Sequence, residues 1–144
     1  MKVIYGDITD IKKGVIIHQV NNKRVMGAGV AKAIRDKYPE HYEDYICSSM
    51  RLGNIVCTAV SDDLCIVGFI SQNGWGRVPH VIYTDYIAFE ECLWTLKEIH
   101  EECPEVECYM PYGIGCGLAN GNWNTISKMI EEICPFITLV KYNK

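Results

Sequence analysis

The sequence lacks the cysteine and histidine spacings from which structural zinc sites are built. It has eight cysteines and four histidines, but no C-x-x-C pair and no H-x-x-x-H spacing. Most of the cysteines fall on apolar faces of the expected helices and strands, where a free thiol behaves as a small hydrophobe. We therefore expect no metal, no cofactor and reduced thiols in a cytoplasmic protein.

Long apolar runs and an excess of positive charge are missing too. The apolar run at the N-terminus is too short for a signal peptide, and no stretch is long enough to span a membrane. With 14 basic and 18 acidic residues, the net charge is −4, so the surface as a whole does not attract nucleic acid or anionic membranes. A phosphate ligand would have to be held locally, for example by backbone N–H groups. We expect a monomer whose partner is a small molecule.

The order of apolar segments indicates an α/β protein. At 144 residues, 49% of them apolar, the chain is about the length of one domain, residues 1–144. Short apolar runs alternate with segments of helical period, which favours βαβ units and a mixed or parallel sheet. The expected strands are Val3–Tyr5, Gly14–Val20, Ile55–Val60, Leu64–Ile70, Val106–Met110 and Phe136–Val140.

Four helices are expected between these strands. They are Val30–Lys37, Glu40–Met50 after Pro39, a long helix with Thr84 as its N-cap and Asp85 in its first turn, and a last helix with Trp123, Ile126, Ile130 and Ile133 on its inner face. In the long helix, the apolar stripe expected to face the sheet is Ala88, Cys92, Leu96, Ile99 and Cys103.

A first glycine-rich segment, Met26-Gly27-Ala28-Gly29-Val30, stands between a buried strand and a helix. Glycines allow close approach of the backbone to a ligand, and the first N–H groups of the helix are free to bind an anion. A tight turn explains such a segment equally well. A Rossmann dinucleotide site is excluded because its third glycine is missing, since position 32 is Lys.

A second glycine-rich segment, Gly113-Ile114-Gly115-Cys116-Gly117-Leu118, also follows a strand and precedes a helix. Alternating glycines form a nest of N–H donors suited to phosphate. In a parallel sheet, two loops at the carboxyl ends of strands meet at one crevice. Two such loops suggest a diphosphate, whereas a pair of flexible turns is the alternative.

With these loops, the sequence resembles the macrodomains. The motifs, in macrodomain order, are Gly6-Asp7-Ile8-Thr9, Asn21-Asn22 before Met26–Val30, and Ile114–Leu118. The resemblance runs from Lys2 to Tyr142 and is greatest to a small branch with terminal ADP-ribose protein glycohydrolases and ADP-ribose-1''-phosphate phosphatases. Asn73-Gly74-Trp75-Gly76-Arg77, followed by Tyr83-Thr84-Asp85-Tyr86, is similar to the bacterial and phage phosphatases. The resemblance implies a three-layer α/β/α fold with a mixed, largely parallel central sheet.

The resemblance also implies roles for individual residues. Asp7 would accept a hydrogen bond from the adenine amino group, with the backbone of Ile8 beside it, although an aspartate here is often only a cap. Asn21 and Asn22 would face the distal ribose. The segments Met26–Val30 and Gly113–Leu118 would hold the diphosphate and distal ribose. Tyr142 would stack on adenine, or is simply an exposed aromatic.

The departures from the family pattern bear on the reaction. The resembling glycohydrolases carry a lysine nucleophile after the strand that here ends in Phe69-Ile70-Ser71, where this chain has Gln72 and Asn73. They also carry an aspartate after Gly-Cys-Gly-Leu, where this chain has Ala119. Without the amine nucleophile and its acid partner, the lysine route is not expected.

Removal of a terminal phosphate depends mainly on positioning and charge stabilisation. The candidate catalytic residues are Asn22, His18, Arg77 and His80. His18 lies in an apolar strand and is otherwise a core histidine, and Arg77 is otherwise a solvated loop residue. Cys116 belongs to the loop structure and has no histidine beside it in the sequence.

The function expected from the sequence is hydrolysis of ADP-ribose-1''-phosphate to ADP-ribose and phosphate. Two alternatives stay open. One is a non-catalytic module that binds ADP-ribose or a related signalling nucleotide, and the other is a hydrolase of ADP-ribosylated macromolecules.

Overall fold

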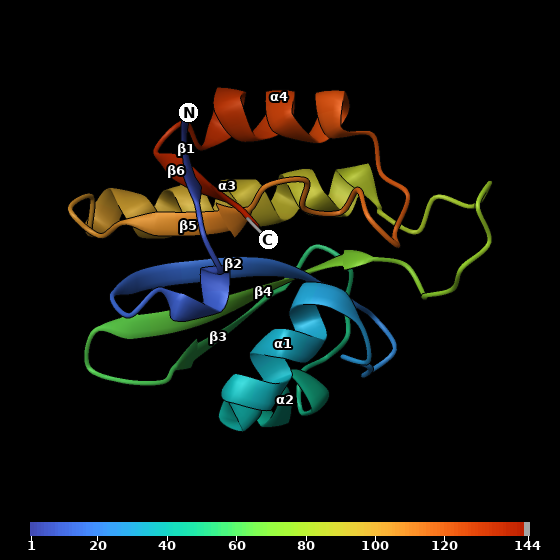
Figure 1. Ribbon diagram of the computed structural model, residues 1–144, viewed down its shortest axis with the longest axis horizontal. Helices are drawn as coiled ribbons and strands as arrows, with labels where there is room; N and C mark the ends of the chain where they lie inside the picture. The colour runs from blue at the N-terminus through green and yellow to red at the C-terminus, as the bar shows by residue number, and fades with distance from the viewer. Residues whose placement is uncertain (143–144) are drawn as a thin grey trace.

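The computed structural model describes residues 1–142, which form a six-stranded sheet between two layers of helices (Figure 1). The strands are β1 (Lys2–Tyr5), β2 (Gly14–Asn21), β3 (Ile55–Ala59), β4 (Leu64–Gln72), β5 (Cys108–Pro111) and β6 (Ile137–Lys141). The helices are a short 3-10 helix η1 (Ile8–Asp10), α1 (Gly29–Lys37), α2 (Pro39–Ile46), α3 (Tyr86–Glu102) and α4 (Trp123–Ile133).

The sheet is mixed and largely parallel, as the sequence predicted. Its strand order is β1-β6-β5-β2-β4-β3, and among the described residues only the edge strand β3 runs antiparallel to its neighbour. Strands β2 and β5 are parallel neighbours in the middle of the sheet. The loops that follow them therefore emerge at the same edge, which is where a ligand crevice forms in open α/β sheets.

Two helices cover each face of the sheet (Figure 1). Helices α3 and α4 pack on one face through a large apolar cluster that includes Ile17, Phe69 and Met110. On the other face, α1 and α2 pack on smaller clusters built around Ile16 and Val20. Neighbouring residues of β2 thus serve opposite faces, which explains the nearly continuous apolar run of this strand.

Some expected element ends were wrong. Helix α2 ends at Ile46, and the chain then turns through Met50, which has a positive φ of 59°. Asp85, not Thr84, is the N-cap of α3, because its side chain accepts a hydrogen bond from the N–H of Ala88. The Thr84 hydroxyl instead donates to the carbonyl of Gly115, 2.6 Å away. A bond to a distant loop therefore overrides the local capping signal.

The inner face of α3 also differs from the expected stripe. Ala88, Cys92 and Leu96 are buried, but Ile99 is 46% exposed and Cys103 is exposed as well. Phe89 and Leu93, which were not expected in the stripe, are fully buried as well. In the last turn of α3 the packing residue is instead His100, whose ring stacks on Phe136 with the ring centroids 3.6 Å apart. No helix among residues 1–142 is long and apolar enough to cross a membrane.

Candidate functional site

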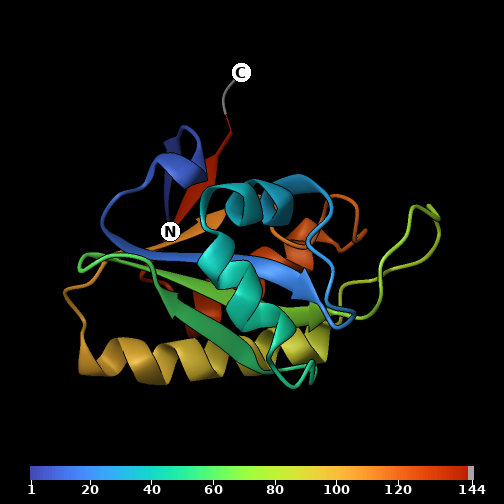
Figure 2. The same cartoon turned by 90° about the horizontal axis from the view of Figure 1, so that it is seen from below.

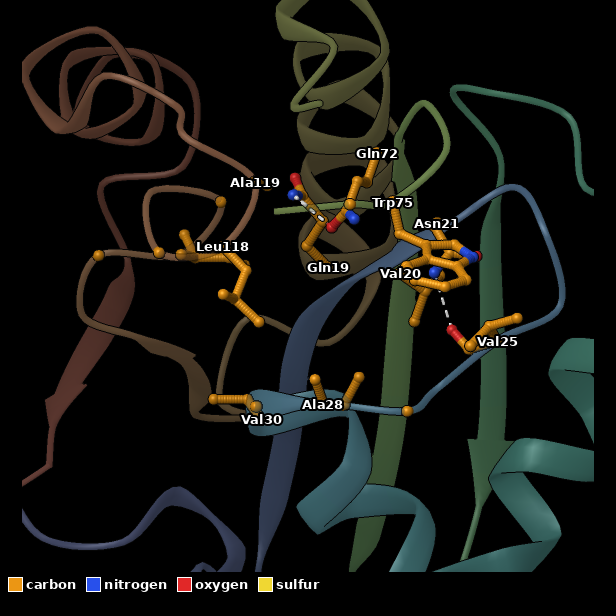
Figure 3. Close-up of a pocket in the computed structure, with 18 of the residues that line it drawn as sticks. Gln19, Val20, Asn21, Val25, Ala28, Val30, Gln72, Trp75, Leu118 and Ala119 are labelled. Atoms are coloured by element: carbon orange, nitrogen blue, oxygen red, sulfur yellow. Dashed lines mark hydrogen bonds between the residues drawn. The ribbon is translucent and has the colours of Figure 1, made fainter. Parts of the chain in front are cut away.

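A cavity of about 590 Å³ opens where the loops after β2, β4 and β5 meet (Figure 3). Its lining comes from all three loops and from the ends of the strands that precede them. The lining residues are Gln19, Val20, Asn21, Val25, Gly27, Ala28, Gly29, Val30, Ala31, Gln72, Trp75, Gly76, Arg77, Tyr112, Gly113, Ile114, Gly115, Gly117, Leu118 and Ala119.

The first glycine loop presents the N-terminus of α1 to this cavity. Ala28 is the N-cap in an extended conformation, and Gly29 starts the helix with a φ of +60°, which glycine adopts without strain. Within residues 1–142, the N–H groups of Gly29, Val30 and Ala31 donate to no protein acceptor. Three free donors at the positive end of the helix dipole therefore border the cavity.

The second glycine loop supplies a further set of donors. The N–H groups of Gly115, Gly117 and Leu118 have no acceptor in the described part of the chain, whereas the N–H of Cys116 is bonded to the carbonyl of Gly113. Gly115 has a φ of +76°, and a Cβ there would lie 3.1 Å from both the Gln19 and Thr84 side chains. Only glycine fits this packing, so the loop is held close to β2.

A polar network fixes the floor of the cavity. The Oε1 atom of Gln19 accepts a hydrogen bond from the Ser71 hydroxyl at 2.8 Å, and its Nε2 donates to the Thr84 hydroxyl at 3.0 Å. The same Nε2 lies 3.4 Å from Oε1 of Gln72 (Figure 3). Thr84 in turn donates to the carbonyl of Gly115. The network joins β2, β4 and the second glycine loop into one unit.

Residues 73–83, called the arm below, project from the body of the molecule beside the cavity (Figures 1 and 2, yellow-green). The arm is anchored at its base, where the N–H of Asn73 donates to the carbonyl of Tyr83. The amide of Asn22 accepts from the N–H of Gly74 at 2.9 Å. Asn120, next to the second glycine loop, donates to the carbonyl of Val81 at 2.7 Å. The arm is therefore tied to both glycine loops.

The cavity favours an anionic ligand. Arg77, exposed on the arm, is the one charged side chain among the lining residues in the described part of the chain. The remaining polar groups among the side chains of the lining residues are uncharged: the amides of Gln19, Asn21 and Gln72, the Tyr112 hydroxyl and the indole N–H of Trp75. A negative group bound here meets backbone N–H donors and a guanidinium, and no carboxylate opposes it.

Most of the residues expected from the sequence to bind a ligand do line this cavity. They are Asn21, Gly27, Ala28, Gly29, Val30, Gly113, Ile114, Gly115, Gly117 and Leu118, together with Arg77. The amide of Asn21 also holds the first loop, because it donates to the carbonyl of Val25 and accepts from the Tyr45 hydroxyl. Met26 lies outside the lining and is fully buried in the core.

The residues expected around adenine lie outside the cavity lining. Asp7 caps η1. Its carboxyl accepts hydrogen bonds from the hydroxyl and the N–H of Thr9, and these bonds, mainly that of the hydroxyl, lower the pKa of Asp7. Ile8 is buried in the core, and Tyr142 is 65% exposed. The N–H of Gly6 donates to the carbonyl of Lys141 at 3.0 Å. These segments therefore lie side by side at the ends of β1 and β6, along the same sheet edge as the cavity.

The four expected catalytic residues do not meet. Of them, only Arg77 lines the cavity. His18 is buried on the side of β2 that faces α2, with its Nε2 atom 2.8 Å from that of His41. His80 is exposed on the arm, and Asn22 holds the base of the arm. The structure therefore does not bring these four candidate side chains together in the cavity.

Cys116 is not set up as a nucleophile. Its side chain is absent from the cavity lining, and burial raises the pKa of its thiol to about 11. A thiol with such a pKa is almost entirely protonated at neutral pH and is therefore unreactive.

Sequence reasoning missed the cavity floor and the indole of Trp75. Gln19 and Ser71 are polar residues within otherwise apolar strands, and this break in the pattern is a signal that an internal network is present. Gln72 and Ala119 do line the cavity. They stand where the resembling glycohydrolases carry a lysine and an aspartate. Nothing in the sequence shows that Trp75 faces the cavity, because its direction depends on the arm.

Comparison with known proteins was made at the levels of sequence and structure. The sequence matches no protein-family model, and no curated protein is significantly similar to it. Solved structures are similar over essentially the whole chain. A protein of Bacteroides thetaiotaomicron is 26% identical with a TM-score of 0.82, covering 100% of this chain and 99% of that one.

A structure named as a macrodomain and one solved with ADP-ribose have a similar fold. The macrodomain of Thermus aquaticus DarG is 20% identical, with a TM-score of 0.77 and coverage of 99% of this chain and 97% of that one. Thermosipho africanus DarTG, solved in complex with ADP-ribose, is 14% identical with a TM-score of 0.77, covering 99% of this chain and 42% of that one. The chain therefore has the macrodomain fold, as its glycine motifs indicated.

Proposed function

We propose that this protein binds ADP-ribose in the cavity between its two glycine loops. The observation that carries the proposal is that unpaired N–H groups from both loops border one cavity, namely those of Gly29, Val30, Ala31, Gly115, Gly117 and Leu118. A single phosphate needs one such set, and two sets facing each other suit a diphosphate. The fold likeness to a DarTG structure that contains ADP-ribose supports the same ligand.

The orientation of the ligand follows from the two ends of the site. Asp7 and Tyr142 lie beyond one end, at the strands β1 and β6, and offer a carboxylate and an aromatic ring to adenine. Asn21 and Gln72 lie at the cavity and offer amides to the hydroxyl groups of the distal ribose. The diphosphate then lies between the glycine loops.

The test is calorimetric titration with ADP-ribose of the wild type and of Gly117→Val. A Cβ at Gly117 meets no protein atom within 4 Å, and its φ is not positive, so this variant folds while its side chain occupies the anion site. We expect one ADP-ribose per chain and a loss of affinity of about tenfold or more in Gly117→Val. Ala59→Val, which enlarges a side chain to valine at an exposed site on β3, is the control and leaves binding unchanged. Absence of binding to the wild type would refute the proposal.

A second candidate function is removal of the phosphate from ADP-ribose-1''-phosphate, which the position of Arg77 favours. Its guanidinium can bind a terminal phosphate in the cavity. Water would attack phosphorus, the bond from phosphorus to the C1'' oxygen would break, and ADP-ribose and inorganic phosphate would leave. The lining residues of the described chain include no histidine, lysine, cysteine or carboxylate. Positioning and charge stabilisation would then supply the catalysis.

The phosphatase activity is tested by measuring phosphate released from ADP-ribose-1''-phosphate. Arg77→Ala should lower kcat more than ADP-ribose affinity, since free ADP-ribose has no terminal phosphate. His80→Gln, on the same arm but outside the cavity lining, should change neither. If the wild type binds ADP-ribose but releases no phosphate above background, the protein is a binding module. Cleavage of ADP-ribosylated macromolecules by a lysine route has no support, because Gln72 and Ala119 stand at the required positions.

A further inference from the structure

Trp75 occupies an unusual place for an exposed tryptophan. Its side chain is 61% exposed, yet it lines the cavity (Figure 3). Trp75 stands between Gly74 and Gly76 in the chain. Gly74 is fixed by two hydrogen bonds. Its N–H donates to Asn22, and its carbonyl accepts from the Gln72 amide at 3.0 Å. The indole is therefore exposed because the hydrogen-bonded base of the arm holds it in this position, and not because the segment is loose.

The cavity that the indole lines has apolar side chains as well as polar ones. Val20 and Val25 line the same end of the cavity, together with Asn21 (Figure 3). A ribose hydroxyl or a terminal phosphate would be served by the amides and by Arg77, and would gain little from an aromatic face. A planar heterocycle gains most from it, because rings stack on indole with favourable dispersion and electrostatics.

We propose that Trp75 is a stacking platform for a planar nitrogen heterocycle carried at C1'' of the distal ribose. The preferred ligands are thus dinucleotide-like derivatives of ADP-ribose, in preference to free ADP-ribose. This inference rests on the proposed function, because it needs the diphosphate between the glycine loops. Trp75 then determines specificity at the open end of the site and has no part in holding the diphosphate.

The test compares ADP-ribose with the two anomers of NAD⁺, which carry a planar pyridinium ring at C1''. We expect one anomer to bind about 3- to 30-fold more tightly than ADP-ribose to the wild type. Trp75→Ala should abolish this preference while changing the affinity for ADP-ribose less than about twofold. Trp75→Phe keeps an aromatic face and should keep part of the preference.

The control variant is Trp94→Ala, because Trp94 is also exposed, at 49%, but lies on α3 outside the cavity lining. It should leave the affinities for all three ligands unchanged. The inference is overturned if neither anomer binds more tightly than ADP-ribose, or if Trp75→Ala weakens ADP-ribose and NAD⁺ equally. If the wild type binds none of the three, the proposed function itself fails. Thermal melting of each variant confirms that it is folded.

Discussion

The Nε2 atom of His18 lies 2.8 Å from the Nε2 atom of His41, in the core between β2 and α2. The Nδ1 atom of His41 lies 2.9 Å from the Thr58 hydroxyl, which donates to the Asp44 carboxylate at 2.7 Å. Thr58 has one proton and gives it to Asp44, so it must accept from Nδ1–H of His41. His41 then accepts at Nε2, and His18 donates. The contact between the two rings holds only while Nε2 of His41 carries no proton, that is, while His41 is neutral.

The histidine pair predicts a loss of stability in mild acid. Burial lowers the pKa of His41 from 6.5 to about 4, partly offset by Asp44, and lowers the pKa of His18 as well. The unfolded chain therefore binds more protons below pH 6.5. Stability is full above that pH and falls as the pH drops toward 4. His41 alone should lower the free energy of unfolding by about 2 kcal/mol between pH 7 and pH 5.

Urea unfolding at pH 7 and pH 5 measures this effect. His41→Gln should be clearly less sensitive to pH than the wild type, because it removes one of the two titrating rings. His80→Gln removes an exposed histidine and serves as the matched control, with the pH dependence of the wild type. Equal pH dependence in His41→Gln and the wild type would contradict the argument.

A hydrogen bond from the Thr84 hydroxyl to the Gly115 carbonyl holds the second glycine loop. Thr84→Val should remove this bond and loosen the loop. Valine has the shape of threonine but lacks the hydroxyl that donates to the Gly115 carbonyl and accepts from the Gln19 amide. The carbonyl then keeps only the N–H of Gly121, and the amide keeps only Oε1 of Gln72 at 3.4 Å. We expect a loss of about 1–3 kcal/mol in the free energy of unfolding, with weaker ADP-ribose binding. Chemical denaturation and calorimetry measure the two effects. Thr84→Ser keeps the hydroxyl and should retain most of both, and its failure to do so would point to packing instead.

Asn22 should act on ligand affinity through the arm. Asn22→Ala removes the acceptor of the Gly74 N–H, and we expect faster amide exchange in residues 73–83 with affinity for ADP-ribose lower by about three- to tenfold. Asn22→Asp keeps an acceptor oxygen and should restore slow exchange. Hydrogen exchange followed by mass spectrometry distinguishes this role from direct contact with the distal ribose. Direct contact would lower affinity and leave exchange in the arm unchanged.

Cys116 should be dispensable for any turnover. Burial raises the pKa of its thiol to about 11, so it is protonated under working conditions. We expect Cys116→Ser to release phosphate from ADP-ribose-1''-phosphate at the rate of the wild type. Alkylation near pH 8 should modify the exposed Cys47 and Cys103 before Cys116. A Cys116→Ser protein that has lost phosphate release but still binds ADP-ribose would show that the thiol takes part.

Local patterns accounted for much of the fold. The apolar run at Gly14–Val20 corresponds to β2, and the 3- and 4-residue spacing of Ile126, Ile130 and Ile133 corresponds to the buried face of α4. Errors arose where a distant group competes with a local signal. Thr84 has the residue type of an N-cap, but its hydroxyl is taken by the carbonyl of Gly115, 31 positions away in the chain.

In the candidate site, too, some features could be predicted from the sequence and others could not. The glycine loops could be located from the sequence, because positive φ angles and open N–H groups depend on a few neighbouring residues. The partners of His18 could not, since both faces of β2 are buried and the apolar pattern does not say which side a polar residue faces. The placement of Trp75 likewise depends on the hydrogen bonds of Gly74 with Asn22, directly after β2, and with Gln72, at the end of β4.

The amino-acid order by itself determined an α/β chain with two glycine-rich turns after buried strands, because periodicity and glycine act over a few residues. Only the tertiary structure decided that these turns line one cavity, that Gln19 supports its floor, and that Trp75 lines it as well. Those relations join residues far apart in the chain, and they exist only once β2, β4 and β5 lie next to one another in the sheet.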